Sequence, residues 1–144
     1  MLLDAQLACS TNQAFTTTAV STNFIDTGGS NPVRNVGWGE EMRMFVTVPV
    51  TFTGGTSIQA EIVSADDAAG TVNVTSMLAG PVTTTANAAA GAVLLDAVLP
   101  TNTRRFIGVR YNVVGAMTAG QVNAGLVHDT DRQRYYANGY PNAY

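Results

Sequence analysis

The sequence predicts an all-β fold, a single jelly-roll or β-sandwich domain of about eight antiparallel strands. In several segments apolar residues recur at every second position, which is the period of a strand with one buried face. Clusters of Gly, Pro, Asn and Asp separate these segments at short intervals, as turns between strands do. No segment shows a sustained helical period of 3.6 residues. A chain of 144 residues suits one domain with a substantial core.

The N-terminal third contains an arm, a strand and a loop. Residues 1–13 mix leucines with polar side chains, and we expect an arm that docks on this chain or on a neighbour. Residues 14–27 are rich in Thr, Val, Phe and Ile, which favour a pleated sheet. Glycines and a proline then predict a loop that extends from Gly28 through Gly39.

Residues 40–52 give the clearest strand signal. Pro49 lacks an N–H group and therefore marks an edge or a bulge. Phe45 is the one large apolar residue on the otherwise polar face. Residues 56–64 alternate in the same way and predict the next strand. The predicted buried face of the first of these two strands comprises Met42, Met44, Val46, Val48, Val50 and Phe52.

The remaining strands follow from the same signals. Residues 72–85 predict a strand that Gly80-Pro81 interrupts, with its second half at an edge. Residues 92–99 are apolar on both faces except at Asp96, which favours a central strand covered on both sides. Residues 104–127 predict a β-hairpin that turns between Gly115 and Gly120. The sandwich is thus expected over residues 14–128, followed by a tail at 129–144.

Composition excludes some partners and favours others. Hydrophobic residues make up 46% of the chain and charged residues only 12%, against an average near 25%. So much neutral surface suits a partner or copies of the same chain, although a Thr- and Asn-rich exterior could also be solvated. All seven basic residues are arginine. Arginine is well suited to interfaces, but codon bias would explain the same pattern. The net charge of −3 argues against nucleic-acid binding.

Few residues could carry chemistry. His128 is the only histidine, so a metal site would have to rest on it with Asp129 and Asp131; a solvated strand end is the plainer interpretation. The adjacent carboxylates Asp66 and Asp67 suit loop solvation or turn capping better than catalysis across a cleft. We therefore expect no enzyme, no cofactor and no metal, and we interpret the single Cys9 as a small buried residue.

No apolar run approaches the length of a membrane span, and we expect no membrane partner. The first ten residues lack a basic region and carry Asp4 within a short apolar run. They do not resemble a signal peptide, so we expect the protein to stay in the cytoplasm where it is made.

Two segments stand out as candidate contacts. The last 16 residues hold four of the five tyrosines, and tyrosine is a common interface anchor. This tail either docks on a partner or sister subunit, or is a disordered terminus. Trp38 lies between two glycines and is either a contact residue or a lid over the core.

The chain resembles the small capsid cement proteins of tailed bacteriophages, the group typified by the cement protein of a Bordetella phage. Three segments carry the resemblance: the opening MLLDAQ, the central SADDAA at 64–69, and RRFIGVRY at 104–111 running into 118–120 and 124–127. The resemblance covers almost the full length, and the tyrosine-rich end matches least.

The resemblance implies a jelly roll without enzymatic activity. It implies oligomers on the outside of an icosahedral head, where they bridge capsomers of the major capsid protein; dimers at two-fold positions are favoured, and trimers are the alternative. We expect the subunit contacts to come from the two arms, with Trp38 as a further candidate, and a tail deletion over 131–144 to weaken head binding. An alternative is a carbohydrate-binding jelly roll on a tail or fibre, with Trp38 and Asn35 as the platform. The candidate interface residues are Leu2, Leu3, Gln6, Trp38, Arg132, Arg134, Tyr135, Tyr136, Tyr140 and Tyr144.

Overall fold

The structure, a computed structural model, describes residues 5–28 and 41–128, and these hold ten strands and two short 3-10 turns. The strands are β1 (Ala8–Ala14), β2 (Ala19–Val20), β3 (Ile25–Asp26), β4 (Arg43–Gly54), β5 (Ser57–Ala65), β6 (Thr75–Ala79), β7 (Thr83–Thr84), β8 (Val93–Val98), β9 (Phe106–Val114) and β10 (Met117–Val127). The 3-10 turns are η1 (Ala5–Leu7), which precedes β1, and η2 (Thr85–Asn87), which follows β7.

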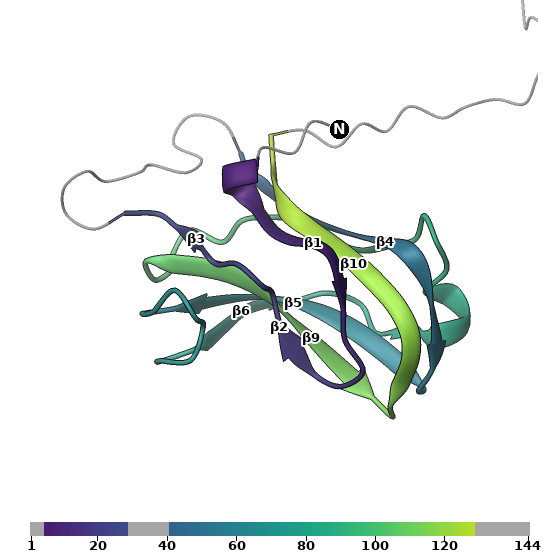
Figure 1. Ribbon diagram of the computed structural model, residues 1–144. Coiled ribbons are helices and arrows are strands. Elements are labelled where there is room, and N and C mark those ends of the chain that lie inside the picture. Colours follow the sequence, from purple (N-terminus) through teal and green to yellow (C-terminus); the bar gives the residue numbers. More distant parts are fainter. Residues whose placement is uncertain (1–4, 29–40, 129–144) are drawn as a thin grey trace, which may run out of the picture.

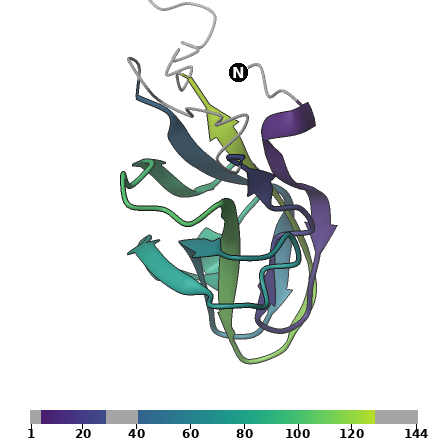
Figure 2. The same cartoon turned by 90° about the vertical axis from the view of Figure 1, so that its left-hand side faces the viewer.

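The strands form two antiparallel sheets that pack face to face (Figures 1 and 2). One sheet has the order β1-β10-β4-β8. The other has the order β2-β9-β5-β6, with β3 also paired to β9 and β7 to β5. If β2 and β3 are counted as one strand, the pairs run from the ends of the chain inward. β1 pairs with β10, β2 with β9, β4 with β8, and β5 with β6. This inward winding of paired strands is the jelly roll, so the predicted fold class is confirmed.

The predicted hairpin at 104–127 is wrong, although its two strands exist. β9 pairs with β5 along its whole length, from Phe106 opposite Ala65 to Val114 opposite Ser57. β10 lies in the other sheet, between β1 and β4. Only Gly115, at φ +80, and Ala116 separate the two strands. The connection therefore crosses from one sheet to the other, and the apolar faces of both strands meet across the core.

Two further strand predictions change. The apolar run at 92–99 forms β8, which is an edge strand of the four-stranded sheet rather than a central one. Its ends are open to solvent, with Val93 48% and Val98 38% exposed. Residues 14–27 give only the short β2 and β3, because the chain bends between them.

The N-terminal arm is shorter than expected. β1 pairs with β10, with Ala8 opposite Gly125 and Ala14 opposite Gln121. The sandwich therefore begins at Ala8 rather than at residue 14, and of the arm only η1 remains among the described residues. The tail at 129–144 lies outside the described residues.

β4 contains the bulge that Pro49 suggested. Asn123 and Gln121 of β10 lie two residues apart, but their partners on β4, Thr47 and Val50, lie three residues apart. The same mismatch recurs between Val50 and Thr53. Each step inserts one extra residue, so the alternation is restored by Phe52, which is buried. Val50, between the two insertions, is 44% exposed, whereas the sequence placed it on the buried face.

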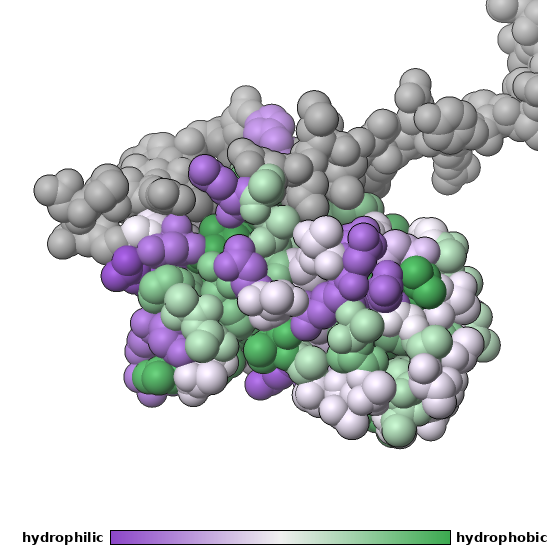
Figure 3. All heavy atoms as spheres, in the orientation of Figure 1, coloured by the Kyte–Doolittle hydropathy of each residue, from purple (hydrophilic) through white to green (hydrophobic). Residues whose placement is uncertain are grey.

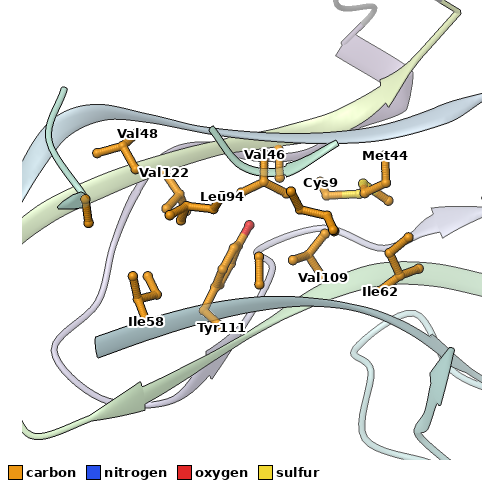
Figure 4. Packing of buried hydrophobic residues seen from close by; sticks show 14 of the residues in the cluster. Cys9, Met44, Val46, Val48, Ile58, Ile62, Leu94, Val109, Tyr111 and Val122 are labelled. Carbon is orange, nitrogen blue, oxygen red and sulfur yellow. The ribbon is translucent and has the colours of Figure 1, made fainter. Parts of the chain in front are cut away.

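Aliphatic side chains from both sheets fill the core, and Tyr111 crosses it (Figure 4). Tyr111 reaches from β9 towards the other sheet, and its hydroxyl is 2.8 Å from the hydroxyl of Ser10 on β1. The ring of Phe15 stacks on that of Tyr111 with centroids 4.9 Å apart. A buried hydroxyl needs such a partner, so this bond helps to fix β1 on the sandwich.

Candidate functional site

The outer faces of the two sheets differ in charge. Three ion pairs lie on or beside the six-stranded sheet, and each joins an arginine on or just before β9 to a carboxylate from another segment. The nitrogen–oxygen distances are 2.7 Å for Arg110–Glu61, 2.9 Å for Arg104–Asp66 and 2.8 Å for Arg105–Asp26. We call this surface the charged face.

Glu61 is the most enclosed member of the charged face, with only 6% of its surface exposed. Its carboxylate accepts hydrogen bonds from Arg110, from Asn112 Nδ2 at 3.0 Å and from the Ser76 hydroxyl. Burial by itself would raise the pKa of Glu61. The bonds from Ser76, Asn112 and Arg110, with the positive charge of Arg110, outweigh burial and hold that pKa below its usual value.

The adjacent carboxylates of the loop after β5 serve the fold. Asp67 caps the turn, because its carboxylate accepts the N–H groups of Thr71 and Val72, both at 2.8 Å. The Val72 N–H, then the Thr71 hydroxyl and the Thr71 N–H, lower the pKa of Asp67. Asp66 is bound by Asn73 and by Arg104, and both contacts lower its pKa. The central segment 64–69 and the segment that begins at Arg104 therefore contact each other.

The four-stranded sheet carries little charge. Among all the residues of β1, β10, β4 and β8, only Arg43 and Asp96 are charged. They pair with each other, with Arg43 Nε 2.7 Å from Asp96 Oδ1. We call the outward side of this sheet the neutral face.

The pairing of β4 with β8 decides which side chains lie on the neutral face. Met44 and Val46, with no exposed surface, point into the core, so Phe45 between them points outward. Val93 lies opposite Thr47 and Val98 opposite Arg43, because Leu94 is an extra residue in β8 that restores the alternation. The neutral face thus includes the apolar side chains of Phe45, Val50, Val93 and Val98.

The neutral face is hollowed at one end. An open groove of about 500 Å³ lies where β1 ends, beside the bulged part of β4 and the start of β10. Its walls include Ala14, Thr16, Val50, Thr118 and Gln121. In Figure 3 the lower right of the sandwich is mainly white and pale green, while purple covers the left and part of the middle. The groove therefore offers uncharged side chains, most of them small, to a ligand.

Reactive side chains are not gathered at the groove. Cys9 is buried, and burial raises the pKa of its thiol to about 12, so it stays protonated and unreactive. His128 is exposed, directly after β10. Within residues 5–28 and 41–128, no three His, Cys, Asp or Glu side chains are grouped so that they could hold a metal ion.

Of the ten interface residues that the sequence suggested, the structure describes only Gln6, an exposed residue of η1. Leu2, Leu3, Trp38, Arg132, Arg134, Tyr135, Tyr136, Tyr140 and Tyr144 lie outside the described residues. The sequence did not reveal the neutral face. Phe45 was its one visible signal, as a large apolar residue on the polar side of a strand.

These observations define a jelly-roll domain with one charged face, tied down by internal ion pairs, and one neutral face. Residues 9–126 match the family model of Bbp16, from β1 almost to the end of β10, and the chain belongs to the Bbp16 family. The name of the family suggests a Bordetella phage protein. No curated protein matches the chain. No helix in the described part is long and apolar enough to span a membrane.

Proposed function

We propose that this protein is a cement or decoration protein of a tailed bacteriophage. It binds the outside of the icosahedral head, bridges neighbouring capsomers of the major capsid protein and stabilises the shell against the packaged DNA. The observation that carries this proposal is the Bbp16 match, which spans nearly the whole sandwich and includes two of the three segments that resemble phage cement proteins, at 64–69 and from Arg104 onward.

The physical character of the domain supports a structural role. The four arginines in the described ranges are each paired with a carboxylate, so none offers an unpaired charge to a phosphate. We propose that the protein works as a homo-oligomer, a dimer before a trimer, without enzymatic activity and without nucleic acid. One oligomer that grips two capsomers binds far more tightly than each contact alone, because the second contact is effectively intramolecular.

The experiment uses heads of the phage that encodes the chain, produced without it. Purified full-length protein is added, and both bound protein and the temperature of DNA release are measured. We expect saturable binding and a higher release temperature, since the bridges resist the outward pressure. Heads that neither bind the protein nor gain heat resistance would contradict the proposal.

The carbohydrate-binding alternative rested on Trp38 and Asn35. Both lie outside the described residues, and no described feature favours it. A glycan array tests it directly, with specific binding to a sugar as the result that would revive it.

A further inference from the structure

We infer that the neutral face, the outward side of β1, β10, β4 and β8, is the surface that lies against the shell, and that the charged face points away from it. This inference rests on the proposed function and names the surface that performs it. The partner is an uncharged patch on the outside of the major capsid protein, with apolar and hydroxyl or amide groups rather than ions.

The cost of removing water separates the two faces. The buried centre of a protein interface is depleted in charged residues, because taking an ion out of water is costly unless the ion is fully paired. The neutral face carries one internal pair, whose side chains are only 26% and 21% exposed. Docking the charged face would instead cover two ion pairs, Arg104–Asp66 and Arg105–Asp26. Their four side chains are 39–51% exposed.

The polar groups of the neutral face are held in place before any partner arrives. The hydroxyls of Thr53 and Thr118 are 2.9 Å apart, and Asn123 Oδ1 accepts the Asn12 N–H at 2.6 Å. The Thr51 hydroxyl accepts the N–H of Ala90 at 2.9 Å. Little side-chain entropy is lost when such a surface is covered, which favours binding.

The edges of this sheet are less suited to a partner than its face. β1 is irregular in register between Ala8 and Gln13, and Asn12 has a φ of +46, so the edge is not a straight template. The link between β6 and β7 lies close to the β8 edge. A Cβ built on Gly80 of this link would lie only 3.2 Å from the Leu94 carbonyl oxygen. On the face itself, Val50 beside the groove and Val93 near the other edge are exposed.

Four valine-to-lysine variants test the inference, because each replaces an exposed valine by the same charged side chain. Val50→Lys and Val93→Lys alter the neutral face, where the valines are 44% and 48% exposed. The controls are Val114→Lys, at the end of β9 in the six-stranded sheet, and Val82→Lys, directly before β7, where the valines are 60% and 64% exposed. Binding of each full-length variant to heads that lack the protein is measured by co-sedimentation, and thermal unfolding confirms that each variant is folded.

We expect Val50→Lys and Val93→Lys to weaken binding about tenfold or more, because a lysine charge must be buried. The controls should bind within about twofold of the unchanged protein. Equal binding by all four variants, or equal losses in all four, would overturn the inference. So would a change in oligomeric state, seen by sedimentation, without a loss of head binding, because the face would then join copies of the chain. If the unchanged protein itself fails to bind heads, the proposed function fails.

Discussion

Phe24 illustrates how single residues fix the fold of this protein. Its ring lies where side chains at Gly70 and Gly108 would otherwise be, since a Cβ at these positions would lie 2.1 Å and 2.6 Å from ring carbons. Gly108, on β9, lies outside the left-handed region, so its cost on substitution is steric. The third segment of the family resemblance therefore includes a glycine that the packing of Phe24 requires.

We predict that Gly108→Ala lowers the free energy of unfolding by about 1–3 kcal/mol, because the core there has no room for a methyl group. In a Phe24→Ala background the same change should cost much less, and urea unfolding of the four proteins measures this coupling. Gly91→Ala is the matched control, since no atom lies within 4 Å of the added Cβ and its cost comes from φ +89 alone. Additive effects of Gly108→Ala and Phe24→Ala would contradict the predicted contact.

Glu61 links stability to pH. The folded protein holds the pKa of this carboxylate below its usual value, so the unfolded chain takes up a proton first as the pH falls. The stabilisation is complete above the unfolded pKa of about 4.3 and is lost as the pH drops through the lower folded value. We predict that the midpoint of thermal unfolding falls less steeply below about pH 5 in Glu61→Gln than in the unchanged protein. An identical slope in both proteins would show that Glu61 is not coupled to folding.

At the scale of elements, alternation in the sequence identified β4, β5, β9 and β10 and, except at Val50, the side of β4 that faces the core. It could not identify their neighbours, because a period of two reports burial of one face and not the partner strand. This is why β9 and β10 were interpreted as a hairpin. The apolar run of β8 misled for a related reason: Leu94, Leu95 and Ala97 point inward, while Val93 and Val98 are apolar but exposed.

The tail is the segment that follows the last strand of the described sandwich. β10 ends at Val127, where its pairing with Arg43 of β4 also ends. We predict that deletion of residues 131–144 leaves the thermal unfolding midpoint unchanged and weakens binding to heads, because four tyrosines are lost. A full-length variant with these tyrosines changed to serine separates aromatic contacts from tail length. Undiminished head binding by the deleted protein would rule out a contact role for the tail.

At the scale of the whole molecule, the sequence predicted the fold class better than the site. From the low charge and the aromatic content of the sequence, we expected the contact residues at the two termini and at Trp38. The neutral face depends on the order of strands, which brings Arg43 beside Asp96 across 53 positions of sequence and leaves the other described ion pairs on the opposite sheet. No local motif reports such a distribution of charge, so this surface emerges only when the sheets are assembled.

The most direct test of the central claim is the copy number of this protein in purified virions, relative to the major capsid protein. A cement protein covers the shell, so we predict one copy per capsid subunit or a simple fraction of that, and the fraction would report the symmetry of the oligomer. A few copies per particle would assign the protein to the tail and contradict a cement role. Absence from the virion would contradict any structural role in the particle.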